Sequence, residues 1–287
     1  MTSTRPVVQV SDAVEAREGA GFLVRRPFAS VDLRDTDPFL LLDEMGPVDY
    51  APGEAKGAPD HPHRGFETVT YVLEGAMEHR DSTGGGGVIG PGDTQWMTAG
   101  AGLVHSEEPT PEMLRDGGRM HGLQLWVNLP RAEKMTPPRY QLIEAARVAR
   151  LERDGVVVRV IAGDVDGVQG PGRTRTPITY AHASLASGAM LDVAWPRDFN
   201  ALVYVLSGEA EIAGRTVRRG QLAVLGDGDR LRVRAVTELE AMLLGGRPIR
   251  EPIAWYGPFV MNTKAEVIAA IEDYEAGRLG RIVPSGS

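Results

Sequence analysis

The sequence contains no cysteine. Disulfide bonds and thiolate chemistry are therefore excluded, and any bound metal must be held by nitrogen and oxygen ligands. No apolar run is long enough to cross a bilayer, and the first ten residues lack the apolar core of a signal peptide. The sequence accordingly predicts a cytoplasmic protein without membrane contact.

The chain also lacks a basic cluster. Its 31 lysines and arginines are scattered among 39 acidic residues, which gives a net charge of −8. Proteins that contact nucleic acid usually gather basic residues on one face or segment, so no direct contact with nucleic acid is expected. The length of 287 residues and the hydrophobic content of 42% suit two packed domains.

Glycine and proline are abundant, with 35 and 20 residues, and they interrupt many short apolar runs. Runs of four to eight residues rich in Val, Leu and aromatic side chains, bounded by Gly, Pro or Asp, are typical of β-strands. Examples are "ETVTYVLEG", "GLQLWVNLP", "GVVVRVIAG", "NALVYVLSG" and "ELEAMLLGG". The sequence therefore predicts an all-β fold.

Two segments have helical patterns instead. "QLIEAARVARLERDG", residues 141–155, predicts a short linker helix that ends at a glycine. "NTKAEVIAAIEDYEAG" opens with a capping box from Thr263 to Glu266, and Gly277 is placed to end the helix. We expect this C-terminal helix to pack on a β domain through one apolar stripe, formed by Val267, Ile268, Ile271 and Tyr274.

An internal repeat organises the strands. The segment "YVLEG", residues 71–75, returns 133 positions later as "YVLSG", residues 204–208, and a Gly-Asp turn follows both copies. Duplication of a β-rich unit predicts two stacked β-barrels or jelly rolls. We place the N-terminal barrel in residues 1–135, the linker in 136–152, and the C-terminal barrel with the final helix in 153–287.

Two pairs of metal-binding side chains occur in the first copy. His61 and His63 are two residues apart, and so are His105 and Glu107. On a strand, residues i and i+2 point to the same face with Cα atoms about 6.6 Å apart, so each pair can converge on one ion. Two such pairs inside one barrel predict a metal site.

Long stretches of the chain resemble the signature motifs of the pirin family, within the cupin superfamily. These stretches are "HPHRGFETVTYVLEGAMEHRDSTG", "PGDTQWMTAGAGLVHSEEP", "GLQLWVNLP" and "YGPFVMNT". The resemblance covers nearly the whole chain. It implies a bicupin with one metal, usually iron, in the N-terminal barrel and no ligands in the C-terminal barrel. Positions 194 and 196, which lie 133 after the two histidines, are Ala and Pro and agree with this expectation.

The carboxylate ligand has two candidates. The general cupin pattern places a glutamate a few residues after H-x-H and selects Glu67, whereas the resemblance to pirins selects Glu107. A bulge at Gly65 would turn Glu67 away from the histidines. Following the resemblance to pirins, we expect a metal held by His61, His63, His105 and Glu107, with Glu67 and Arg64 as neighbours of the site.

The remaining histidines are expected outside the ligand set. His79 follows the turn after the repeat, and a surface or cross-strand role is predicted for it. His121 is expected to be a structural histidine with its hydrogen bonds satisfied. His182 belongs to the second copy, where no other metal ligand accompanies it.

The resemblance implies quercetin 2,3-dioxygenase activity with one divalent metal, most often Fe(II), although other divalent transition metals suit the same ligands. The partners would be dioxygen and a flavonol-like aromatic molecule, bound between residues 66–73 and 122–127, with Glu107 as both ligand and base. Pirins also include protein-binding regulators that respond to the redox state of the metal, which is the alternative function. A metal-dependent sugar-phosphate isomerase would need a basic cluster, and Arg64 is the only basic residue near the ligands in the sequence.

Overall fold

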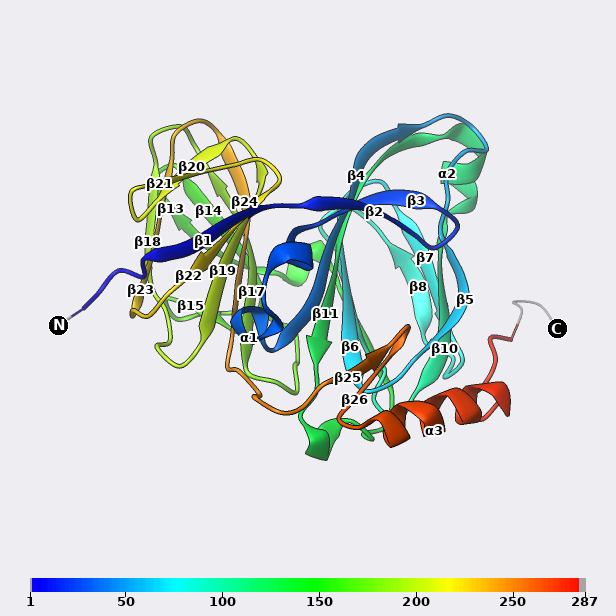
Figure 1. Ribbon diagram of the computed structural model, residues 1–287. Helices are drawn as coiled ribbons and strands as arrows, with labels where there is room; N and C mark the ends of the chain where they lie inside the picture. Colours follow the sequence, from blue (N-terminus) through cyan, green and yellow to red (C-terminus); the bar gives the residue numbers. More distant parts are fainter. Residues whose placement is uncertain (1, 284–287) are drawn as a thin grey trace. The chain divides into compact units, whose positions relative to one another are not determined.

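The computed structural model describes residues 2–283, which fall into two compact β units. The first barrel comprises residues 15–25, 41–145 and 249–283, and the second barrel comprises residues 2–14, 26–40 and 146–248. Each unit consists of a seven-stranded and a four-stranded sheet (Figure 1). The all-β prediction is confirmed.

In the seven-stranded sheet of the first barrel, most neighbouring strands are not consecutive in the chain. From edge to edge, the strands are β12 (Arg139–Ile143), β9 (Thr94–Thr98), β6 (Phe66–Glu74), β11 (Gly118–Asn128), β4 (Phe39–Tyr50), β3 (Phe22–Arg26) and β2 (Val14–Glu18). The four-stranded sheet consists of β5 (Ala58–His63), β10 (Leu103–Pro109), β7 (Met77–Asp81) and β8 (Gly86–Ile89). Helix α2 (Pro111–Asp116) and the 3₁₀ turn η2 (Arg131–Glu133) lie in the connections.

The second barrel repeats this arrangement. Its larger sheet runs β1 (Val7–Asp12), β22 (Gln221–Leu225), β19 (Asn200–Ser207), β24 (Leu239–Gly246), β17 (Ile178–Leu185), β14 (Val156–Ala162) and β13 (Ala149–Arg153). The smaller sheet consists of β18 (Met190–Ala194), β23 (Arg230–Ala235), β20 (Glu209–Ile212) and β21 (Arg215–Arg218). The connections hold η1 (Pro27–Ser30), α1 (Leu33–Thr36) and the hairpin of β15 (Asp164–Val165) and β16 (Val168–Gln169).

The sequence repeat occupies the same place in both barrels. It forms the ends of β6 and β19, each of which is the third strand of its larger sheet. The closing glycines, Gly75 and Gly208, both have a φ of 81°, which other residues rarely adopt. A side chain at either glycine would also collide with a backbone carbonyl, that of Arg119 or Glu238. The turn therefore needs glycine twice, which explains why this part of the repeat is recognisable.

Each barrel is completed by a segment from the far end of the chain. Strand β1, near the N-terminus, pairs with β22 and holds the edge position in the second barrel that β12 holds in the first. Residues 249–283 in turn belong to the first barrel. The predicted boundaries, 1–135 and 153–287, differ from this division because they gave each barrel one continuous stretch. Edge strands pair through backbone hydrogen bonds, which nearly any sequence can form. The sequence therefore contains no pattern that predicts which barrel a terminal segment joins.

The predicted linker helix over residues 141–155 is wrong. This part of the chain forms β12, the short turn η3 (Ala145–Arg147) and β13. Strand β12 pairs with β9 from Arg139 to Ile143, and β13 pairs with β14. The open edges of two sheets supply hydrogen-bond partners for this segment, and that gain outweighs the helical preference of its alanines, leucines and arginines.

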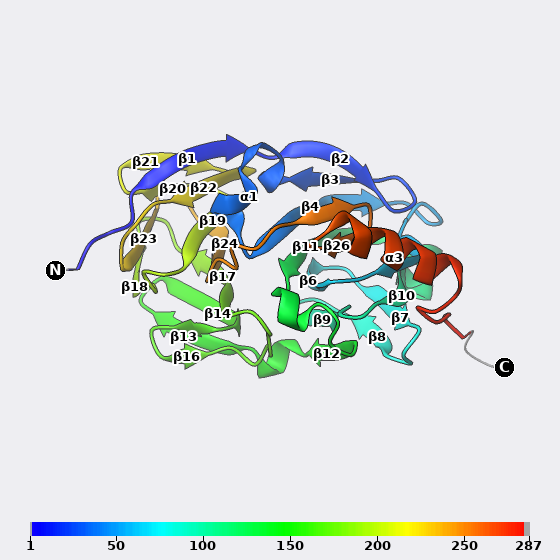
Figure 2. The same cartoon turned by 60° about the horizontal axis from the view of Figure 1, so that its bottom comes forward.

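The C-terminal helix is present as α3 (Lys264–Glu275), and its capping box is confirmed. The Thr263 hydroxyl accepts from the Glu266 N–H, and the Glu266 carboxylate accepts from the Thr263 N–H. Together with the hairpin of β25 (Ala254–Tyr256) and β26 (Phe259–Met261), α3 belongs to the first barrel (Figures 1 and 2). None of the helices within residues 2–283 has the length and apolarity to span a bilayer.

The apolar stripe of α3 differs from the prediction. Val267 and Ala270 are buried and Ile271 is partly buried, in a cluster with residues of β10 and β26. Ile268 is 56% exposed and Tyr274 is 40% exposed. The buried face follows the i, i+3, i+4 spacing and uses the small Ala270 for close packing, whereas Ile268 lies about 100° around the helix from Val267.

Candidate metal centre

Three histidines meet inside the first barrel where β5 and β10 run side by side. In the antiparallel register His61 lies opposite His105, and His63 lies opposite Leu103. The imidazole centroids are 4.2 to 4.9 Å apart. One nitrogen from each ring can be chosen so that all three lie within 4.8 Å of one another. The pairing of β5 with β10 therefore brings the three imidazoles close enough to bind one ion together.

The second nitrogen of each ring is held by another group. Nδ1 of His61 lies 2.7 Å from the Pro59 carbonyl oxygen, and Nδ1 of His63 lies 3.3 Å from that of Pro258. Nδ1 of His105 lies 3.4 Å from Nδ1 of His79. With these Nδ1–H groups as donors, all three Nε2 atoms remain to bind a metal.

The Nε2 atoms have the surroundings that a metal ion requires. Those of His61 and His63 are 3.1 Å apart. Nε2 of His105 is buried, and within residues 2–283 no group lies in hydrogen-bonding range of it. A buried nitrogen without a partner is costly unless a ligand completes it, and a divalent ion bound by the three Nε2 atoms would do so.

The protonation states also favour binding. Burial lowers the pKa of His63 and His105 well below the usual value, and the neighbouring His61 adds to the effect for both. The two rings are therefore neutral at pH 7. Neutral imidazole is the form that binds metals, so no proton has to be removed from these rings first.

Glu107 is buried on the same inward face, two residues beyond His105. Its Oε1 accepts hydrogen bonds from Thr70 Oγ1 at 2.6 Å and Gln95 Nε2 at 3.1 Å, and its Oε2 accepts one from Gln124 Nε2 at 2.7 Å. The carboxylate does not belong to the group within 4.8 Å that the histidines form. If it binds the ion, it exchanges at least one of these neutral donors for the metal.

Glu67 points to the opposite face of β6. Gly65 has a φ of 91°, which produces the predicted change of direction after His63. Glu67 pairs with Thr98 of β9 and accepts a hydrogen bond from its hydroxyl at 2.6 Å. Thr70 and Gln95, which contact Glu107, lie three residues from Glu67 and Thr98 and so face the other way. This position differs from the expectation that Glu67 neighbours the histidines.

Arg64 contacts the C-terminal helix. Its Nε donates to the Ala101 carbonyl at 2.6 Å, and its terminal nitrogen forms an ion pair with Asp273 of α3 at 2.8 Å. The expected role as a neighbour of the metal is thus replaced by a link between the end of β5 and α3. The Asp273 partner lies more than 200 residues away, so the sequence gave no sign of it.

The other histidines have well-defined partners. His79 is fully buried and takes the predicted cross-strand role, because it lies between His105 and Asp81. His121 is paired with the buried Glu44 at 2.9 Å, in keeping with a structural role. His182, in the second barrel, lies 2.7 Å from Glu240. The signal for His79 was present in the sequence, since His79 and Asp81 form a third i, i+2 pair.

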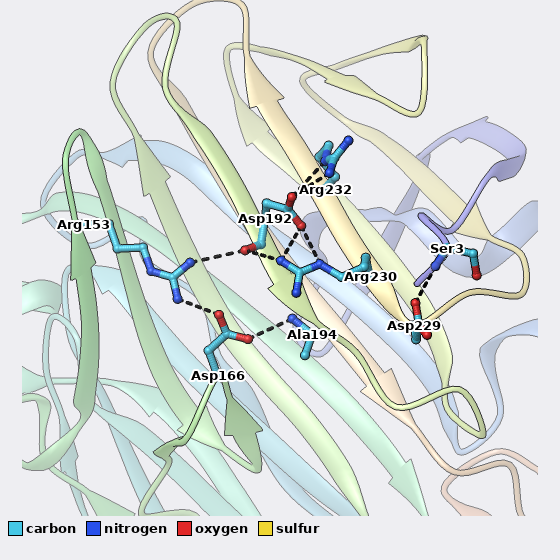
Figure 3. Close-up of polar contacts among 8 residues, drawn as sticks. All are labelled: Ser3, Arg153, Asp166, Asp192, Ala194, Asp229, Arg230 and Arg232. Atoms are coloured by element: carbon cyan, nitrogen blue, oxygen red, sulfur yellow. Dashed lines mark hydrogen bonds and ion pairs between the residues drawn. The ribbon is translucent and has the colours of Figure 1, made fainter. Parts of the chain in front are cut away.

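The second barrel has no such cluster at the matching strands. There the inward positions of β18 and β23 are apolar, with Val193 opposite Leu231 and Leu191 opposite Val233 in a fully buried core. Polar contacts lie elsewhere on these strands (Figure 3). The side chains at these inward positions are apolar and offer no ligand atom to an ion.

Figure 3 shows how β18 is held from outside. The Asp192 carboxylate binds Arg230 at 2.7 Å and Arg232 at 2.7 Å, both from β23. Arg153 bridges the Asp192 carbonyl and the Asp166 carboxylate, which also accepts from the Ala194 N–H at 2.8 Å. The strand that corresponds to β5 is therefore held by ion pairs on its outer face and by a packed apolar core on its inner face.

Comparison with known proteins agrees with this architecture. The model of the Pirin family matches residues 21–127, and that of the Pirin C-terminal cupin domain matches residues 180–280. The chain belongs to the pirin family. It is 44% identical to a pirin-like protein of Caulobacter vibrioides over 277 residues, covering 96% of this chain and 99% of that protein. Human pirin is 40% identical, with 98% and 96% covered.

Among solved structures, a crystal structure of quercetin 2,3-dioxygenase from Acinetobacter baumannii superimposes with a TM-score of 0.92. Its sequence is 39% identical, and the match covers 98% of this chain and all of that one. The protein is therefore a pirin with the bicupin fold, and its three-histidine cluster lies in the N-terminal cupin barrel.

Proposed function

We propose that this pirin is a single-metal dioxygenase that opens the C ring of a flavonol such as quercetin. The supporting observation is the convergence of one nitrogen from each of three histidines, on the inward face that also carries the buried carboxylate of Glu107. The similarity to a crystallised quercetin 2,3-dioxygenase supports the same activity. In the overall reaction the flavonol gains both atoms of dioxygen and loses one carbon as carbon monoxide.

His61, His63, His105 and Glu107 are proposed as the ligands of one divalent ion, Fe(II) in preference to other divalent transition metals. Three neutral imidazoles and one carboxylate leave a net charge of about +1 and open coordination positions, which suits an anionic chelating substrate. Bound iron would supply Lewis acidity toward the flavonol oxygens and redox chemistry toward dioxygen.

Glu107 is proposed to accept the proton of the flavonol 3-hydroxyl. Donors on three strands fix its carboxylate, namely Thr70 on β6, Gln95 on β9 and Gln124 on β11. A carboxylate whose position is fixed by neighbouring hydrogen bonds can meet an incoming hydroxyl without further reorganisation. Removal of that proton would leave the flavonol as an anion, whose 3- and 4-oxygens are the groups that could bind a divalent ion.

Aromatic side chains next to the histidines suit a flat substrate. The rings of Phe66 and Trp126 lie 4.3 Å apart at 33°, and Trp126 lies 5.2 Å from His63. The Trp126 indole N–H donates to the side-chain oxygen of Gln124 at 3.4 Å, which connects this aromatic pair to the Glu107 network. Both aromatic residues lie on the strands that the sequence predicted as walls of the substrate site.

Dioxygen uptake by the iron-loaded protein tests this function. Quercetin should be consumed with an equal amount of dioxygen and should release carbon monoxide. Luteolin, which lacks the 3-hydroxyl, should give no uptake because Glu107 has no proton to accept. If iron-replete protein consumes no dioxygen with quercetin, the proposed dioxygenase activity is contradicted. That result would favour the alternative function, a redox-dependent protein-binding regulator.

Matched glutamine variants test the carboxylate. Glu107→Gln should lower quercetin turnover by about 100-fold or more, because an amide is neither a base nor a strong ligand. Glu67→Gln should keep turnover within a few fold, since Glu67 is equally buried but faces away from the histidines. Steady-state kinetics with the metal content of each sample provide the comparison. Loss of turnover in Glu67→Gln with normal turnover in Glu107→Gln would reverse the assignment.

A further inference from the structure

His105 differs from the other two histidines in what holds its Nδ1. His61 and His63 each contact a backbone carbonyl, whereas His105 contacts the side chain of His79 at 3.4 Å. His79 Nε2 in turn lies 3.2 Å from Asp81 Oδ2. His105, His79 and Asp81 thus form a row of side chains. The antiparallel pairing of β7 and β10 produces this row, because it places Asp81 opposite His105 and His79 opposite Glu107.

Asp81 is fixed by the loop that follows it. Its Oδ1 accepts hydrogen bonds from the Thr83 N–H at 2.8 Å, the Thr83 hydroxyl at 2.6 Å and the Gly85 N–H at 3.0 Å. Burial alone would raise the pKa of Asp81, but the hydrogen bonds from His79, Thr83 and Gly85 outweigh it and hold the pKa below the usual value. One oxygen therefore faces the loop, and the other faces His79.

His79 has no freedom to turn away. Its side chain is fully buried, and the ring of Tyr140 on β12 stacks on it with centroids 4.9 Å apart at 17°. One nitrogen of His79 therefore contacts His105 and the other contacts Asp81, while the Tyr140 ring packs on the face of the imidazole.

The proton order along this row follows from the acceptors. The Asp81 carboxylate can only accept, so His79 must donate from Nε2. When that proton is the only one on His79, its Nδ1 accepts, and His105 has to carry its own proton on Nδ1. His105 is thereby left with an unprotonated Nε2, the buried atom that has no partner within residues 2–283.

We propose that His79 and Asp81 are positioning residues that set the tautomer, orientation and donor strength of His105 as a metal ligand. This inference rests on the metal site of the proposed function but not on the reaction. Asp81 acts on His105 through His79: the carboxylate increases the basicity of the His79 ring, and a more basic acceptor at the Nδ1–H of His105 increases the donor strength of His105.

Asp81→Asn reverses the proton order. Its amide oxygen keeps the three loop hydrogen bonds, and its NH₂ group then faces His79 Nε2. His79 has to accept there and donate from Nδ1, which conflicts with the Nδ1–H of His105. We expect Co(II) to bind about 10-fold or more weakly than to the parent, with shifted visible absorption bands. Competition with a chelator and the Co(II) spectrum measure both effects.

Asp93→Asn is the matched control. Asp93 lies in the same barrel, and its carboxylate also accepts backbone hydrogen bonds, from the Gly90 N–H at 3.0 Å and the Ala145 N–H at 2.8 Å. Within residues 2–283 it accepts no hydrogen bond from a histidine. This variant should bind Co(II) as the parent does, with the same spectrum. Equal affinity and equal spectra for Asp81→Asn and the parent would overturn the proposal, and so would the same loss in both variants.

Nitrogen-15 NMR of the histidines in the metal-free parent provides a measurement without any substitution. The proposal requires a protonated Nδ1 and an unprotonated Nε2 in His105, and the opposite tautomer would overturn it even if Asp81→Asn does not fold. Neither measurement uses flavonol or dioxygen. Absence of quercetin turnover would therefore contradict the reaction alone, whereas a parent that binds no Co(II) would overturn the site and the row behind it.

Discussion

Replacing His61 and His105 together by alanine is expected to abolish metal binding, from one ion per chain in the parent to none. The two rings lie opposite each other on β5 and β10, and two of the three converging nitrogens are lost. The remaining His63 and Glu107 come from different strands and cannot hold a divalent ion at micromolar concentration. Elemental analysis after loading and dialysis measures the effect.

His182→Gln is the control for this experiment. His182 is also a buried histidine, but it lies in the second barrel beside Glu240 and should leave metal content unchanged. Two equivalents of metal in the parent, or full occupancy in the double variant, would show that the ion binds elsewhere.

Lys134→Met is expected to lower the free energy of unfolding by about 3 kcal/mol, because three buried oxygens lose their donor. The Lys134 ammonium donates to the Gly65 carbonyl at 2.8 Å, to Asn128 Oδ1 at 2.7 Å and to the Val260 carbonyl at 2.9 Å. Its side chain is 2% exposed, and burial lowers its pKa to about 8, so it is still protonated at pH 7. Urea denaturation at pH 7 measures the change.

Lys264→Met makes the same substitution at an exposed lysine and should change the free energy of unfolding by less than about 0.5 kcal/mol. Hydrogen exchange should also increase over β26 in Lys134→Met, because the contact to Val260 is lost. A Lys134→Met variant as stable as the parent would mean that water replaces the ammonium at these oxygens.

The parts of the molecule that depend on local spacing were predictable from the sequence. Alternation on strands placed His61, His63 and His105 on inward faces, and the repeat revealed the duplication. A change of direction at Gly65 was also anticipated, and the positive φ found there explains the orientation of Glu67. These features need only a few consecutive residues.

Features that join distant segments were not predictable. The Pro258 carbonyl at His63, the Asp273 partner of Arg64 and the place of β1 in the second barrel all depend on tertiary pairing. The segment of β12 and β13 was misjudged for the same reason, since its partners decide between helix and strand. A single sequence carries little record of such pairings.

The exchange of terminal segments has a consequence for the order in which a nascent chain can fold. Every strand of the second barrel has left the ribosome once residue 246 is clear of the exit tunnel, because β1 precedes all the other strands of this barrel in the chain. The histidines of the first barrel emerge before that point. Pro258, Val260 and α3, which contact His63, Lys134 and Arg64, emerge after it. The barrel whose histidines are made first is therefore completed after the second barrel, and the contact between His63 and Pro258 at the proposed metal site can form only once residue 258 has emerged.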